Sequence, residues 1–232
     1  MKNNMYKIIT LGLAMLVSLA SFAQRNVTQF MGIPVDGTKA SMIQKLKAKG
    51  FTYNTRLDCL EGEFNGRSVD IHIVTNNNKV YRIMVSDAIG SDEGDIKIRF
   101  NNLLRQFQKN ERYIPSDMVG DYEIGEDEDI SYQMSVKNKR YQAAFFQVNK
   151  DTDNDTTGGF AYMKKYVETR TDELADMTEE EMMNALDLQA TMFMLSKIQH
   201  KSVWYMISEK YGRYFINMYY DNELNQANGD DL

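Results

Sequence analysis

Cys59 and His72 are the two residues of this chain whose types and spacing could support covalent chemistry. Asn65-Gly66 is a strong signal for a two-residue hairpin turn, and pairing the strands around it places Cys59 opposite His72. Directly opposed Cβ atoms lie about 4.5–5.5 Å apart, within reach of a thiol–imidazole hydrogen bond. A neighbouring imidazolium lowers the pKa of a thiol and favours the nucleophilic thiolate. The pair is therefore a candidate nucleophile and base.

The same register places Glu61 opposite Asp70, on the hairpin face that carries Cys59 and His72. These carboxylates could orient the imidazole, but their negative charge would also raise the thiol pKa. A flat strand face supplies neither a pocket nor an oxyanion hole. Cysteine, histidine and carboxylate side chains are all metal ligands, so the cluster is also a candidate metal site. The simplest interpretation is a small buried cysteine beside a surface histidine.

A second acidic segment, DTDNDTTGG, resembles the start of a calcium-binding loop because Asp151, Asp153 and Asp155 alternate in it. Such a loop requires glycine at its sixth position and glutamate at its twelfth, where this chain has Thr156 and Tyr162. An acidic hairpin turn is the preferred interpretation, and weak Ca²⁺ binding is the alternative. No Walker loop, H-E-x-x-H or paired C-x-x-C motif occurs in the sequence, and we expect no cofactor.

Helical and strand-like segments alternate around these candidates. Helical patterns lie between Thr38 and Gly50, at residues 92–110, and at 171–199 with a break near Thr178. Strand patterns lie at 60–64, 68–75, 79–87, 129–136, 140–148, 160–168 and in both halves of 202–222. A helix followed by an antiparallel hairpin, three times over, predicts an α+β fold. In it, helices pack on one face of an antiparallel sheet built from hairpins.

The N-terminus has the features of a secretory signal. Lys2 and Lys7 accompany an apolar run, and Ser21 and Ala23 supply the small residues of a cleavage site. We expect a signal peptide at 1–23, a single α+β domain at 24–222 with possible sub-units 24–90, 91–168 and 169–222, and a polar, frayed tail at 223–232. No later segment approaches the ~20 apolar residues of a membrane span. The protein is thus expected to be exported, periplasmic or secreted, without a transmembrane segment.

Charge and cysteine content limit the classes of partner. With Lys2 and Lys7 in the signal, residues 24–232 carry 25 basic and 33 acidic side chains, a net charge of −8. Nucleic acid demands a basic face, so it is not an expected partner. The single cysteine, Cys59, excludes an internal disulfide, and stability must come from core burial.

Aromatic side chains crowd the last predicted hairpin. The candidate binding residues there are Trp204, Tyr205, Tyr211, Tyr214, Tyr219 and Tyr220. Those that face outward would suit a protein interface or could stack on sugar rings. Packing beneath the long helix is the alternative, because large aromatic side chains commonly supply core area.

Several stretches resemble uncharacterised exported proteins of Bacteroides-type bacteria: GIPVDGT before the first helix, EFNG in the first hairpin, and the ending KYGRYFINMYYDNELNQANGDDL. The helix-plus-sheet units also resemble, more loosely, the β-lactamase inhibitor protein and small outer-membrane lipoprotein folds. Those relatives bind other proteins, so the resemblance implies a binding role. We expect an exported, soluble, non-enzymatic protein that binds another protein or a cell-envelope component. Carbohydrate binding through the aromatic hairpin is the alternative, and a thiol enzyme using Cys59 and His72 is a third hypothesis.

Overall fold

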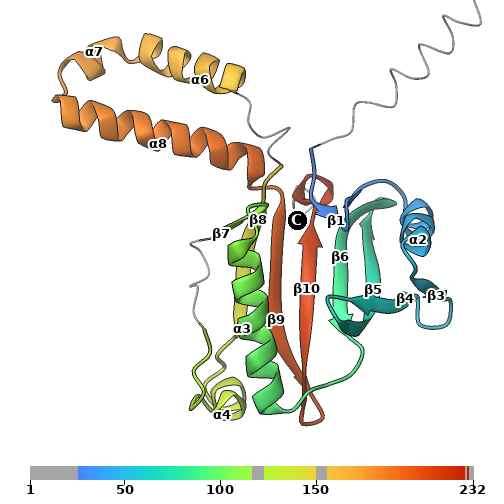
Figure 1. Ribbon diagram of the computed structural model, residues 1–232. Helices are drawn as coiled ribbons and strands as arrows, with labels where there is room; N and C mark the ends of the chain where they lie inside the picture. The colour runs from blue at the N-terminus through green and yellow to red at the C-terminus, as the bar shows by residue number, and fades with distance from the viewer. Residues whose placement is uncertain (1–25, 117–122, 150–155, 228, 230–232) are drawn as a thin grey trace, which may run out of the picture.

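The computed structural model describes residues 26–116, 123–149, 156–227 and 229, and one large antiparallel sheet dominates it (Figure 1). Its eight strands lie in the order β3 (Thr52–Asn54), β4 (Cys59–Phe64), β5 (Arg67–Asn76), β6 (Lys79–Asp87), β10 (Arg213–Asp221), β9 (Ser202–Lys210), β8 (Gln142–Gln147) and β7 (Tyr113–Pro115). Two short strands, β1 (Gln29–Phe30) and β2 (Ile33–Pro34), pair separately. The predicted α+β class with antiparallel sheets is confirmed.

The first half of the sheet contains the hairpin predicted at Asn65-Gly66, formed by β4 and β5. Both turn residues have positive φ, 51° and 72°, as a tight turn matched to the strand twist requires. The predicted register is also confirmed, since Leu60 pairs with Ile71 and Glu61 pairs with Asp70. Alternation then places the apolar members of both strands on one face and the polar members on the other.

Two helices cover the apolar face of this sheet. α2 (Lys39–Ala48) begins at Thr38, whose hydroxyl accepts the Ser41 N–H. α3 (Glu93–Lys109) begins at Asp92, whose carboxylate accepts the Asp95 N–H. Their buried apolar residues are Met42 and Leu46 of α2 and Ile96, Phe100, Leu103, Leu104 and Phe107 of α3. All of them join the strand side chains in one hydrophobic core.

One ion pair is buried in that core. Arg99 of α3 donates to both carboxylate oxygens of Asp87 on β6, at 2.8 and 2.5 Å, and their side chains are 7% and 3% exposed. Asp87 also accepts the backbone N–H of Ile216 on β10, at 3.1 Å. The pair therefore joins α3 to the two strands at which the halves of the sheet meet.

The predicted strand at residues 129–136 is wrong, because Ile130–Ser135 form a helix, α4. Asp129 caps it by accepting the Tyr132 N–H, and Glu93 of α3 accepts the Ile130 N–H. Ile130 and Met134, four residues apart, both pack against the core. Residues at this spacing share one face of a helix as well as one face of a strand, so their apolar pattern fits either element. β8, predicted as its hairpin partner, pairs instead with β7 and β9.

The predicted strand at 160–168 is also wrong, since Thr156–Thr169 form a helix, α6. It packs against α8 (Glu179–Ile198), where the rings of Tyr162 and Phe193 lie 5.2 Å apart and the Tyr162 hydroxyl donates to Gln189. α7 (Thr171–Ala175) connects the two helices. The predicted break near Thr178 is confirmed, because Thr178 and Glu181 form a capping box at the start of α8. Figure 1 shows α6, α7 and α8 extending away from the sheet.

The polar tail does not fray at its first residues, contrary to the sequence prediction. Glu223–Asn225 form a short 3-10 helix, η1. The Asn225 amide donates to Asp36 and to the Val80 carbonyl, both at 2.8 Å, and the Asn76 amide donates to the Asn225 carbonyl. Buried amide hydrogen bonds therefore hold the segment after β10 against β6 and the loop after β2.

Candidate functional site

The side of the large sheet opposite α2 and α3 carries the polar half of the strand pattern. We call this side the open face. The strand registers align one row across it, consisting of Thr52, Glu61, Asp70, Ser86, Asn217, Met206 and Gln142. Most of these side chains are half-buried. The open face thus brings together residues that lie far apart in the sequence.

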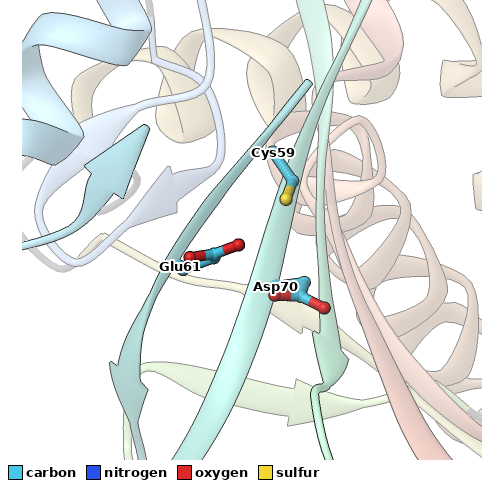
Figure 2. Close-up of side chains that lie close together, drawn as sticks. All are labelled: Cys59, Glu61 and Asp70. Atoms are coloured by element: carbon cyan, nitrogen blue, oxygen red, sulfur yellow. The ribbon is translucent and has the colours of Figure 1, made fainter. Parts of the chain in front are cut away.

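Cys59, Glu61 and Asp70 form a cluster on the open face, within the β4–β5 hairpin (Figure 2). Cys59 and Glu61 are two residues apart on one strand and therefore point to the same side, while Asp70 pairs with Glu61 from the next strand. The sulfur and one oxygen of each carboxylate lie within 4.8 Å of one another. Cys59 is only 1% exposed, whereas Glu61 is exposed and Asp70 is half-buried. The cluster is therefore a buried thiol beside two carboxylates that solvent reaches.

The environment of Cys59 disfavours the thiolate. Burial raises the pKa of the Cys59 thiol, and the Asp70, Glu61 and Asp58 carboxylates raise that pKa further. A nucleophilic cysteine at neutral pH needs the opposite shift. Burial is therefore the main cause of the raised thiol pKa, and the carboxylate effect expected from the sequence adds to it.

The Cys59–His72 contact that the sequence predicts stays a prediction. The pairing of Leu60 with Ile71 keeps the predicted register, but the paired residues of β4 and β5 end there, and on its other edge Cys59 pairs with Asn54 of β3. Within the described residues no hydrogen bond joins Cys59 to His72, and His72 lies outside the group of potential metal ligands. The raised pKa of the Cys59 thiol is the opposite of what the thiol-enzyme hypothesis requires.

The aromatic residues of β9 and β10 divide between the two faces. Tyr205, Tyr214 and Tyr220 are at most 6% exposed and lie in the core, so they cannot belong to an exposed binding face. Trp204 and Tyr219 are half-buried on the open face. Tyr211 lies at the hairpin tip and is 92% exposed.

Trp204 and Tyr219 make a polar-edged aromatic stack on the open face. Their rings are 3.9 Å apart and inclined by 15°. Arg82 of β6 lies 5.6 and 5.1 Å from the two ring centroids and donates to both oxygens of Asp221, at 2.6 and 2.7 Å. The indole N–H also donates to Asp221, at 3.0 Å. Hydrogen bonding to Asp221 raises the pKa of Arg82. The contacts among Arg82, Asp221 and the two rings hold the stack in place.

The helical arm, residues 156–199, has the densest group of exposed apolar side chains. Residues at least 38% exposed there are Phe160, Tyr162, Val167, Met177, Met183, Leu188, Met192, Met194 and Leu195. α8 packs against α6 through Phe193 and Gln189, whereas Leu188 and Leu195 lie well away from that contact and Met192 lies at its edge, beside Gln189. Monomeric proteins rarely leave large apolar patches in water unless the patch binds something.

Sequence reasoning did not identify this arm as a site. A usable signal was present, because residues 186–195 contain one charged side chain, Asp187, and apolar residues on every side of a helix. A helix that is apolar all round is normally buried. Asp151, Asp153, Asp155 and the proposed signal at 1–23 lie outside the described residues.

Comparisons of the chain with protein-family models, curated proteins and solved structures found no match. Among the described helices, none combines the length and the apolar character needed to cross a membrane. The function must therefore be argued from the surfaces themselves.

Proposed function

We propose that this is a non-enzymatic binding protein that docks a partner protein on its helical arm. The exposed apolar side of α8, centred on Leu188, Met192 and Leu195, carries the proposal. These side chains are 58%, 51% and 41% exposed. They follow one another at spacings of three and four residues, which makes a continuous stripe along a helix. Such a stripe is what a helix presents to an apolar groove in a partner.

The charge of the arm favours a protein over a membrane surface. Residues 156–199 carry eight acidic and four basic side chains, a net charge of −4. Helices that lie on membranes usually carry lysine and arginine on their polar face, where they attract anionic lipids. An apolar stripe with acidic surroundings suits a protein that has an apolar groove with basic residues at its rim.

The acidic residues lie mainly at one end of the stripe. Glu179, Glu180 and Glu181 form the first turn of α8, whereas Lys197 is in its last turn. This arrangement also suits the helix dipole, so it stabilises α8 in the absence of a partner. A partner groove with basic residues near the α8 N-terminus would therefore fix the direction in which the stripe docks.

The test is site-specific photo-cross-linking in the cells that make the protein. A photoreactive residue at Met192 is expected to capture one discrete partner protein, and one at Ile98, 61% exposed on α3, is expected to capture none. Replacing Leu188 and Leu195 by Gln should abolish capture at Met192. Capture of a second copy of this chain, of lipid, or of equal products at both positions would refute the proposal.

Carbohydrate binding is the second candidate, supported by the aromatic stack of Trp204 and Tyr219 on the open face. Beside it is an open depression of about 400 Å³ lined by Thr75, Asn76, Tyr81, Arg82, Gln226 and Ala227. An aromatic ring next to polar amide and hydroxyl groups is a suitable environment for a sugar. Oligosaccharides should then change the fluorescence of Trp204, the only tryptophan. An unchanged spectrum across a panel of cell-envelope oligosaccharides would exclude this candidate.

We propose that the protein acts outside the cytoplasm in either case, because residues 1–23 have the features of a secretory signal. N-terminal sequencing of the protein from its own cells tests this directly. A mature N-terminus at Gln24 or Arg25 is expected, and a chain that retains Lys2 and Lys7 would contradict export by this route.

A further inference from the structure

We propose that Cys59, Glu61 and Asp70 form a binding site for a borderline-soft divalent cation such as Zn²⁺. The site lies on the open face and is independent of the helical arm. One thiolate and two carboxylates supply three protein ligands, and solvent supplies the fourth. The sulfur is the distinguishing ligand, since thiolates select zinc-like cations over Ca²⁺ and Mg²⁺.

The spacing of the three ligand atoms fits such a cation. All three lie within 4.8 Å of one another. The centre of an equilateral triangle with that edge is about 2.8 Å from each corner, whereas Zn–O and Zn–S bonds are about 2.0–2.3 Å long. Each ligand atom therefore has to move by less than about 1 Å, which side-chain rotation supplies without moving the strands.

The buried thiol is a second observation that points to a ligand. Cys59 is 1% exposed, and no hydrogen bond holds its sulfur within the described structure. Figure 2 shows the sulfur directed toward the space between the two carboxylates. An ordinary structural cysteine packs as a small hydrophobic side chain, and an apolar neighbourhood is its usual environment. This sulfur instead faces two acidic groups.

The two carboxylates are also arranged for a cation. Glu61 and Asp70 are directly opposed across the strand pair, where like charges destabilise a hairpin. No basic side chain forms an ion pair with either of them in the described residues. The Asn54 amide donates to one oxygen of Glu61, at 2.7 Å, and this contact leaves the other oxygen to coordinate. Groups that orient a ligand in this way typically change metal affinity by about 10–100-fold.

The strands fix the positions from which the ligands reach the cation. Cys59 pairs with Asn54 of β3 on one side, and Glu61 pairs with Asp70 of β5 on the other. β4 is therefore hydrogen-bonded along both edges at this point, and a site on such a strand pair is held more precisely than one on a loop.

The experiment is a Co²⁺ titration of the purified protein, followed by displacement with Zn²⁺. Coordination by Cys59 is expected to give a thiolate-to-cobalt charge-transfer band in the near ultraviolet, which Zn²⁺ removes. Asp70→Asn and Glu61→Gln should each weaken Co²⁺ binding tenfold or more, and Cys59→Ser should abolish the band. Glu63→Gln is the matched control, because Glu63 is on the same face of β4 but faces Ser68, and it should leave binding unchanged.

Two results would overturn the proposal. One is the absence of a charge-transfer band in the unmodified protein, and the other is a Co²⁺ affinity in the Asp70→Asn and Glu61→Gln variants equal to that of the unmodified protein. The second result would mean that the thiol alone binds cobalt. The carboxylate variants decide the matter even if Cys59→Ser fails to fold, because both side chains reach solvent, and circular dichroism confirms that each variant is folded.

Discussion

Removing the Asp87 carboxylate should destabilise the protein more than any change at a surface ion pair. In Asp87→Ala, the buried Arg99 guanidinium loses both of its carboxylate contacts, and the Ile216 N–H loses its acceptor. Breaking a buried pair by removing one partner costs about 3–5 kcal/mol. For a protein of this size, 1 kcal/mol corresponds to about 2–4 °C in the unfolding midpoint. The expected decrease is therefore about 6–20 °C.

Thermal and urea unfolding of three variants provide the assay. Glu123→Ala is the matched control, since Glu123 pairs with Arg105 at the surface, with side chains 53% and 45% exposed, and such pairs contribute less than about 1 kcal/mol. The double variant Asp87→Leu/Arg99→Met replaces the buried pair by apolar groups and should recover most of the lost stability. If Asp87→Ala is no more destabilising than Glu123→Ala, the assignment of a structural role to the Asp87–Arg99 pair is wrong.

Three further changes test other parts of the fold. In Gly62→Ala, the new methyl group would lie 2.5 Å from the Phe51 ring, so unfolding free energy should fall by about 1–3 kcal/mol, and a variant as stable as the wild type in urea would contradict the packing described. Hydrogen bonding from Lys139 lowers the pKa of Glu128 below its usual 4.5. The stability that the ionised Glu128 carboxylate contributes is therefore complete above pH 4.5 and is lost as the pH falls through the lowered pKa. The difference in unfolding free energy between wild type and Glu128→Gln should accordingly shrink in acid. Thr178→Ala removes the capping box of α8 and should destabilise the helix end by about 1 kcal/mol. Faster hydrogen exchange in the first turn of α8 would report this loss. Unchanged exchange there would mean that the box does not hold the helix end.

Local sequence signals predicted the elements that have one strong local cause. Asn65-Gly66 fixed a turn and thereby the register of its hairpin, and the pairing of Thr178 with Glu181 marked a helix start. The failures at residues 129–136 and 160–168 have a common origin. Short segments with several apolar residues satisfy both the two-residue and the 3.6-residue period, and the contacts that decide come from elsewhere in the chain, such as Phe193 for α6.

The shared face of the candidate site could be predicted from the sequence, but the contact made by its thiol could not. Alternation placed Cys59, Glu61 and Asp70 on one hairpin face, because side-chain direction follows directly from register. The partner of the thiol was not predictable, since the orientation of its sulfur depends on a rotamer and on the pairing of Cys59 with Asn54 on a three-residue strand. Such short edge strands carry almost no sequence signal of their own.

The most direct test of the proposed function is the affinity of the cross-linked partner for two variants of this protein. One carries Leu188→Gln, Met192→Gln and Leu195→Gln on the arm, and the other carries Gln at Ile89 and Ile98, which are 71% and 61% exposed elsewhere. Fewer than about a third of interface residues cost more than about 1 kcal/mol when truncated, and those residues cluster at the interface centre. A combined loss of at least about 1.4 kcal/mol for the three residues, which is tenfold in affinity, is therefore expected. We predict at least tenfold weaker binding by the arm variant and less than twofold change in the other. Equal affinities for both variants would contradict the account.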